Sequence, residues 1–248
     1  MGGGSQFCAT ESSTLRAKVA TEFSIQLMNT AKLRQVIKCA GGMTAMHVSL
    51  TELVDVVLKA GSPKATQVAQ IKARSLENYK PFKDFYKSLR DALIETHRNG
   101  GSRDFLSARI SHVREPKRRR RYDELVAHYK RWWGRKDMAW FTPPSATYSS
   151  SGVSVSVNPE IGLEFGGDRY VIKLYFKADQ LKKSSADLIT GLMASALSGQ
   201  GDEKFGVLDV ERGKLYFRQG QPPDVLVAMI DAELAYIAQL WPALGDAA

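Results

Sequence analysis

Apolar and polar side chains alternate along residues 153–177, which gives the strongest strand pattern in the chain. A period of two predicts half-buried strands, because successive side chains of a strand point to opposite faces. A second, shorter pair of such runs follows on either side of a turn at Gly213. We predict strands at 153–157, 161–165, 170–177, 205–210 and 214–217.

The second and third of these strands are predicted to form a hairpin. Pairing Phe165 with Tyr170 places a set of large apolar side chains on one face, which we expect to be core. Its members are Ile161, Leu163, Phe165, Tyr170, Ile172, Leu174 and Phe176. The opposite face would be polar and exposed to solvent. On it, Glu160 would lie diagonal to Lys173 and Lys177, within reach of their long side chains.

Elsewhere the apolar residues recur at three- and four-residue steps, which predicts helices. Ser49 and Glu52 have the spacing of a capping box at the start of one of them. Ser62 and Pro63 offer a cap and a first helical residue for the next. We predict helices at 23–40, 50–58, 63–74, 82–98, 105–113, 122–133, 185–197 and 224–241.

These elements predict an α+β fold. We expect residues 1–22 to be a disordered lead-in and 23–134 to be a basic helical domain. Residues 135–152 contain two prolines and a serine run, which predicts a linker. The α+β domain would then span 153–248, with a mixed or antiparallel sheet. From the last helix of the arm, the order is helix, three strands, helix, two strands and helix.

Positive charge is concentrated in one segment of the chain. The net charge is +9, yet residues 64–136 alone hold 20 Lys and Arg against 8 Asp and Glu. Within that segment, Lys117, Arg118, Arg119, Arg120 and Arg121 are consecutive. Such a segment favours a polyanionic partner, and we expect DNA or RNA rather than a membrane. The alternative is a basic surface that only keeps the protein soluble.

A helix-turn-helix is a second possibility for how nucleic acid is recognised. Two short helices flank an Ala-Gly-Ser-Pro turn at 60–63. The second helix would carry Gln67 and Gln70, whose amides are suited to reading bases in the major groove. Any pair of packed helices with a polar outer face gives the same pattern.

Cysteine usage and hydropathy bear on where the protein works. Cys8 and Cys39 form no disulfide framework and no metal-ligand pair, which fits a reducing compartment. We find no apolar run long enough to cross a bilayer and no leader pattern. The sequence predicts a cytoplasmic protein without membrane contact.

The element order from Tyr122 to Val210 resembles the core of the PD-(D/E)XK nuclease superfamily. That core is a helix, three strands, a helix and a strand, with its site on the second and third strands. Pro159-Glu160 stands at the start of the second strand, and Lys173 lies on the third. Glu124, on the preceding helix, would take the place of the family's auxiliary carboxylate. The chain departs from the pattern at Val171, where the family has an acidic residue.

The resemblance implies a Mg²⁺-dependent phosphodiesterase. Glu160, Lys173 and Lys177 would be the catalytic residues, and Glu160, Glu124 and Asp179 the metal ligands. Carboxylates hold Mg²⁺, and a nearby lysine supplies fixed positive charge for the reacting phosphate. A phosphate-binding face without catalysis and an exposed lattice of salt bridges remain alternatives. A further alternative is that the protein is a non-enzymatic component of a larger complex. It would then form an oligomer, or bind a protein partner through Trp132 and Trp133.

Overall fold

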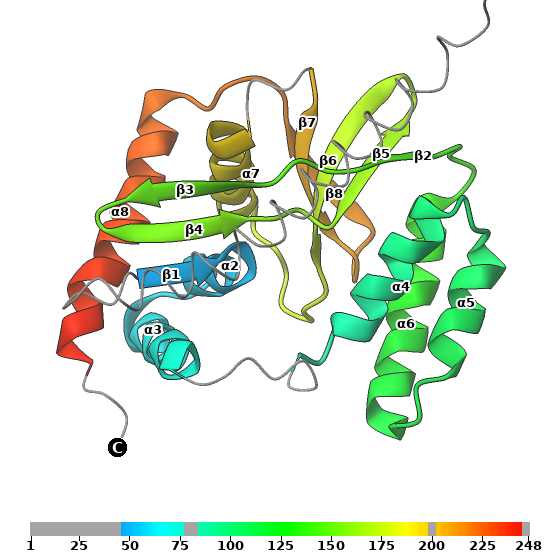
Figure 1. Ribbon diagram of the computed structural model, residues 1–248, viewed down its shortest axis with the longest axis horizontal. Helices are drawn as coiled ribbons and strands as arrows, with labels where there is room; N and C mark the ends of the chain where they lie inside the picture. The colour runs from blue at the N-terminus through cyan, green and yellow to red at the C-terminus, as the bar shows by residue number, and fades with distance from the viewer. Residues whose placement is uncertain (1–45, 77–83, 198–201, 245–248) are drawn as a thin grey trace, which may run out of the picture. The chain divides into compact units, whose positions relative to one another are not determined.

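A five-stranded sheet forms the centre of the computed structural model, which describes residues 46–76, 84–197 and 202–244 (Figure 1). The strands run in the order β2 (Ala139–Phe141), β5 (Ile161–Phe165), β6 (Asp168–Tyr175), β7 (Lys204–Asp209) and β8 (Lys214–Arg218). The β6–β7 pair is parallel and is connected through helix α7 (Lys183–Leu197), whereas the other neighbours are antiparallel. The α+β fold class predicted from the sequence is confirmed. The predicted lead-in and the predicted helix at 23–40 lie outside the described residues.

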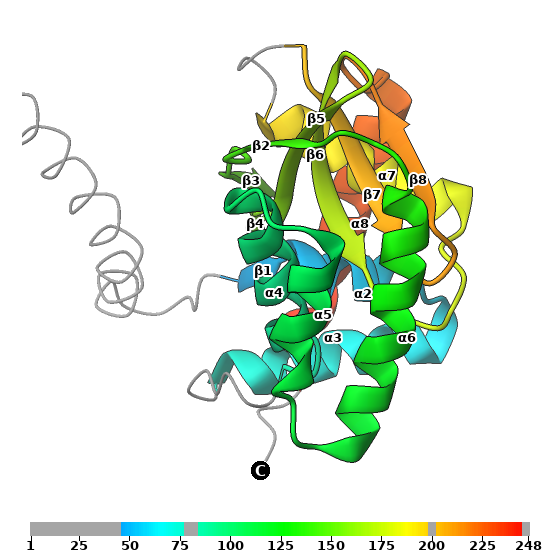
Figure 2. The same cartoon turned by 90° about the vertical axis from the view of Figure 1, so that its right-hand side faces the viewer.

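Three helices cover one face of this sheet. They are α4 (Lys87–Arg98), α5 (Arg103–Ser111) and α6 (Pro116–Trp133), and together we call them the helical layer. Figure 2 shows them grouped on one side of the strands. Their apolar side chains form one core with the hairpin residues Ile161, Leu163, Tyr170, Ile172 and Leu174. The predicted apolar face of the hairpin is therefore confirmed.

The opposite face is covered by a second core. It contains α7, α8 (Asp224–Ala243), α2 (Leu50–Val57) and α3 (Gly61–Leu76). A small sheet of β1 (Met46–Ser49), β4 (Val153–Val157) and β3 (Ala146–Ser150) belongs to the same core. Because α2 and α3 share this core with the C-terminal elements, the predicted boundary between an N-terminal helical domain and a C-terminal domain is not observed.

The predicted linker at 135–152 is wrong for the same reason. β2 and β3 both lie within it, and each pairs with a strand of the predicted α+β domain. Pro143 and Pro144 do interrupt regular structure, but they only separate these two short strands. β2 approaches β5 so closely that a Cβ at Gly162 would overlap the carbonyl oxygen of Phe141.

The start of α2 is observed as its capping residues predict, whereas those of α3 and α6 differ from the prediction. Ser49 caps α2, and its side chain and that of Glu52 form the reciprocal capping box predicted from their spacing. α3 begins at Gly61, one residue before the predicted Ser62 cap. α6 begins at Pro116, so the basic run 117–121 lies inside the helix rather than ahead of it.

The hairpin register differs from the predicted one by two residues. Phe165 pairs with Asp168, and Ile161 pairs with Ile172. The connection is the two-residue turn Gly166-Gly167, in which both residues have positive φ, as the tightest hairpin turns require. A shift of two residues keeps every side chain on its predicted face.

The other predicted face of the hairpin is not exposed. Val171, Lys173 and Tyr175 are all buried. Val171 and Tyr175 belong to the core that contains α7 and α8. The sheet is covered on both faces, so the polar, solvent-facing surface expected around Lys173 does not exist.

Helix α8 is long and apolar enough to cross a membrane by length and composition alone, the one such helix among the described residues. The expectation that no apolar run reaches that length is therefore wrong. In the structure, however, Leu226, Ile230 and Leu234 lie in the core. The acidic groups of its central turns also face inward to partners. Glu233 pairs with Lys64 of α3 at 2.6 Å, and Asp231 accepts a hydrogen bond from Tyr148 of β3 at 2.8 Å.

Candidate functional site

The structure brings together two residues of the predicted site, Glu160 and Lys173. Lys173 donates its Nζ to Glu160 Oε1 and to Thr51 Oγ1 of α2, the latter at 2.8 Å. The backbone N–H of Leu174 donates to Glu160 Oε2 at 2.9 Å. The two charged side chains are only 5% and 7% exposed. They form a buried ion pair that links β6, the start of β5 and α2.

Neighbouring charges complete this cluster. Arg90 of α4 lies 3.8 Å from Glu160 Oε1 and also pairs with Asp84 at 2.5 Å. Lys177 makes an ion pair with Asp55 of α2 instead of lying beside Glu160. Both oxygens of Glu160 therefore already accept hydrogen bonds from the chain itself, and its charge is balanced by Lys173.

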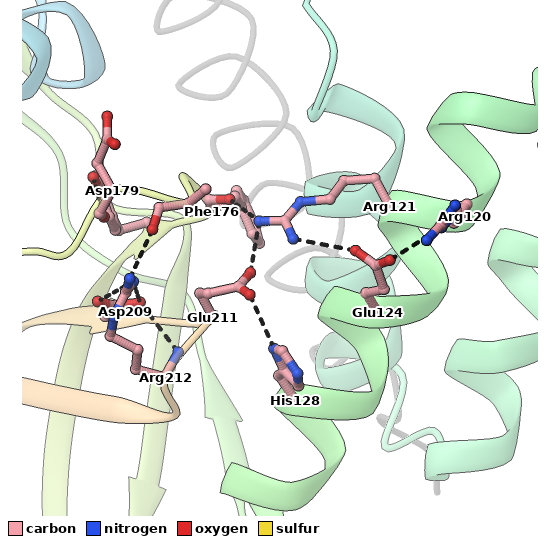
Figure 3. Close-up of polar contacts among 11 residues, drawn as sticks. Arg120, Arg121, Glu124, His128, Phe176, Asp179, Asp209, Glu211 and Arg212 are labelled. Atoms are coloured by element: carbon pink, nitrogen blue, oxygen red, sulfur yellow. Dashed lines mark hydrogen bonds and ion pairs between the residues drawn. The ribbon is translucent and has the colours of Figure 1, made fainter.

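The predicted metal ligands are not brought together. Glu124 lies on α6, where it pairs with Arg120 and Arg121. Asp179 follows β6, and its backbone oxygen accepts a hydrogen bond from Tyr175 at 2.8 Å. Figure 3 shows Glu124 and Asp179 on separate elements. Within 46–76, 84–197 and 202–244, no three His, Cys, Asp or Glu side chains are arranged to hold a metal ion.

The basic run is partly neutralised by acidic residues of its own helix. Arg118 lies 3.3 Å from Glu115, Arg119 lies 2.9 Å from Asp123, and Arg120 lies 3.4 Å from Glu124. All three pairs have helical spacings of three or four residues. Part of the positive charge of the run is therefore neutralised by the protein itself.

Arg121 attaches the run to the sheet. Its guanidinium pairs with Glu211 at 2.6 Å and donates to the carbonyl oxygen of Phe176 at 3.1 Å (Figure 3). Glu211 also lies 3.8 Å from His128, which follows Arg121 by about two turns of α6. Arg121 is thus an anchor for the helix, and we do not expect it to be free for a ligand.

The exposed cations in and beside the helical layer that lack an acidic partner form two groups. Arg98, Arg103 and Lys136 each lie over a tryptophan ring, whereas four others lie near the ends of α6. Arg114, Lys117, Arg131 and Arg135 make no ion pair with any residue in the described part of the chain. Arg120 is paired but is 86% exposed, so water screens its interaction with Glu124. These cations lie at the two ends of α6 and are the ones available to an anion.

Two open clefts flank the first turns of α6. One, of about 590 Å³, lies between α4, α5 and α6 and is lined by Arg109, Arg114 and Arg118 among others. The second, of about 480 Å³, is lined by Lys117, Arg120 and Arg121 together with Pro116 and Glu124. Basic side chains therefore line both sides of the same helix end.

Of the two predicted base-reading residues, one is buried and the other is exposed. Gln67 is only 5% exposed and accepts a hydrogen bond from Lys59 at 2.6 Å. A buried glutamine cannot reach a base edge, so this part of the helix-turn-helix prediction is wrong. Gln70, by contrast, is exposed on α3.

The tandem tryptophans are largely part of the core. Trp132 lies 5.3 Å from Tyr129 and 6.0 Å from Phe165, measured between ring centroids. Trp133 stacks at 4.5 Å against His97, which is buried beside Tyr129. Both tryptophans pack against the core under the helical layer.

Several residues that build these clusters escaped sequence reasoning. Thr51, Asp55 and Arg90 come from helices far from the hairpin in sequence. Asp209 is fully buried, where it accepts from Leu181 N and Arg212 N. The capping box of Ser49 and Glu52 placed α2 correctly, but no local pattern showed which strand α2 would contact.

Comparison with known proteins gives no further assignment. No protein-family model matches the chain, and no curated protein matches its sequence.

Proposed function

We propose that this chain is a nucleic-acid-binding protein whose binding surface is the helical layer. The observation that carries the proposal is the set of exposed, unpaired cations Arg114, Lys117, Arg131 and Arg135. They belong to a segment, 84–136, that holds 15 Lys and Arg against 7 Asp and Glu. An excess of eight positive charges on one layer suits a polyanion, and phosphate contacts supply most of non-specific nucleic-acid affinity.

We further propose that the buried pair of Glu160 and Lys173 stabilises the fold and does not cleave nucleic acid. Glu160 and Lys173 occupy the positions that the nuclease resemblance gives them, but they neutralise each other inside the protein. A phosphodiesterase needs its carboxylate for a metal and its lysine for the reacting phosphate. In this chain each group is used by the other, and Val171 stands where the family has a second acid.

Salt-dependent binding tests the proposal. We expect the full chain to bind labelled duplex DNA, single-stranded DNA or RNA in fluorescence anisotropy, with affinity falling as salt rises. Each neutralised phosphate should contribute about 0.9 to the slope of log K against log salt on duplex DNA. Replacing Arg114, Lys117, Arg131 and Arg135 together with serine should abolish binding while leaving the unfolding midpoint unchanged. Failure of the wild type to bind any of the three at low salt would refute the proposal.

A nuclease is the alternative that the sequence resemblance raises and that the direct contact between Glu160 and Lys173 argues against. If it is correct, purified protein should cleave DNA or RNA in Mg²⁺ or Mn²⁺, and Glu160→Gln should remove that cleavage. Intact substrates with both metals would leave binding as the function.

A further inference from the structure

Each of the two clefts beside α6 combines unpaired or exposed cations with at least one exposed acidic residue. Glu115, 54% exposed, lines the first cleft, and Glu124, 45% exposed, lines the second. Both carboxylates are paired with arginines three or four residues away on the same helix. Pairs of this kind are weak and exchange readily for a better anion.

We propose that a nucleic-acid phosphate backbone crosses the first two turns of α6, with a phosphate in each cleft, and that Glu115 and Glu124 are the anions it displaces. The inference rests on the proposed function and assigns that function to one end of the helix. It also gives these two carboxylates a role, which is to compete with the phosphates for the same arginines.

The first cleft offers a ready set of donors. Arg114 is exposed and makes no ion pair within the described residues. Arg118 is 23% exposed, and its Nε lies 3.3 Å from Glu115. Arg109 is held by Glu95, and Asp91 also lines the cleft. A phosphate there could accept from Arg114 and Arg118 together, as arginine forks prefer.

The second cleft lies on the other flank of the same turns. Lys117 has no acidic partner among the described residues, and Arg120 is almost fully exposed. Arg121 closes the cleft but stays tied to Glu211 and Phe176. A phosphate at this position would replace Glu124 as the partner of Arg120 and would gain Lys117.

The chemistry of the linings predicts recognition of the backbone and not of bases. In the described residues, the groups that line the two clefts include neither an amide side chain nor an aromatic ring other than the imidazole of His112. Amide side chains read adenine edges and aromatic rings stack on bases, whereas arginine and lysine can contact either phosphates or guanine edges. With only cations available as donors, we expect phosphate contacts to dominate and binding to depend little on sequence.

The test measures the binding of two short duplexes of unrelated sequence to the full-length protein, with matched variants of α6. Glu115→Gln and Glu124→Gln should each tighten binding roughly two- to fivefold, because each removes a competing anion. Asp123→Asn is the control, since Asp123 pairs with Arg119 on the same helix but lines neither cleft. It should change affinity less than either glutamate substitution.

A second pair of variants locates the site along the helix. Lys117→Ser with Arg120→Ser should weaken binding and lower the salt slope by about 0.9, the value for the one phosphate of the second cleft. Arg131→Ser with Arg135→Ser makes the same change of charge at the opposite end and should have a smaller effect.

The inference is overturned, with the proposed function still standing, if the wild type binds but the substitutions at Arg131 and Arg135 weaken binding more than those at Lys117 and Arg120. It is equally overturned if the glutamate variants bind no better than Asp123→Asn, or if one duplex is clearly preferred. A wild type that binds neither duplex at low salt, nor single-stranded DNA or RNA, would refute the proposed function itself.

Discussion

Lys173 and Lys117 carry the same charge in opposite surroundings. Lys173 is buried in the sheet, where Glu160 and Thr51 accept hydrogen bonds from its ammonium group. Lys117 is exposed on α6 and has no acidic partner within the described residues. Burying a charge costs free energy that only a well-placed partner offsets, so Lys173 is committed to the fold. Lys117 keeps its hydration and remains available to a ligand.

The origin of the counter-charges separates these two regions as well. The partners of Lys173 lie 13 and 122 residues away in the sequence. The arginines of α6 find most of their partners three or four residues away, with Glu211 as the exception. Long-range pairs hold elements together, whereas local pairs adjust the charge of one helix. The number of basic residues in a segment is therefore a poor measure of its binding surface unless paired and unpaired cations are counted separately.

The largest expected effect is on the buried pair. Lys173→Met leaves Glu160 charged, buried and without its main partner, which should lower the free energy of unfolding by about 3–5 kcal/mol. Urea denaturation would measure the loss. The double variant Glu160→Gln with Lys173→Met removes both charges and should recover much of the stability. A single variant as stable as the wild type would show that the pair does not support the fold.

Local sequence signals predicted much of the fold. The capping box of Ser49 and Glu52 lies within four residues, and the inward positions of α8 repeat along one helix. The faces of the hairpin follow from its period of two, so they survived a register error of two residues. Each of these features depends on neighbours in the chain, which a sequence displays directly.

The sequence could not predict features that depend on distant neighbours. Lys173 looked solvent-facing because nothing near it in sequence indicates that α2 and α4 cover Glu160. Gln67 looked like a base reader because its burial beside Lys59 depends on how α2 and α3 pack. β2 is only three residues long, too short for a period of two to distinguish it from a loop. The candidate site was therefore predicted by residue type but not by exposure.

His97 of α4 is a buried titratable residue inside the helical layer. Burial lowers the pKa of His97 to about 4, from an ordinary value near 6.5. The unfolded chain then binds more protons than the folded one between these two values, so stability should fall as pH drops from 6.5 to 4. The full contribution is about 3 kcal/mol. His97→Gln, which can still hydrogen-bond to Tyr129, should flatten this part of the stability profile, and an unchanged profile would contradict a buried neutral imidazole.

Glu211 is intermediate between the buried and the exposed charges. It is 23% exposed and joins the sheet to α6 through Arg121 at 2.6 Å and His128 at 3.8 Å. Glu211→Gln should cost about 1 kcal/mol, less than Lys173→Met because water can reach the remaining arginine. Thermal unfolding would measure it. A loss as large as that of the buried pair would mean that exposure does not set the ranking.

The smallest effect on stability is expected at Arg120, where the effect on binding should be clear. Its pair with Glu124 is highly exposed, so Arg120→Ser should change the free energy of unfolding by less than about 0.5 kcal/mol. The same substitution should weaken nucleic-acid binding and lower its salt slope by up to about 0.9, because the phosphate of the second cleft loses one of its two cations. Chemical denaturation and salt-dependent anisotropy on one protein preparation measure both quantities. An exposed cation is expected to separate stability from binding in this way, whereas Lys173→Met should alter stability and leave the salt slope of the folded protein unchanged. A clear loss of stability in Arg120→Ser would show that the charge of Arg120 supports the fold, as that of Lys173 does. It would contradict the distinction between exposed cations that bind a ligand and buried cations that stabilise the fold.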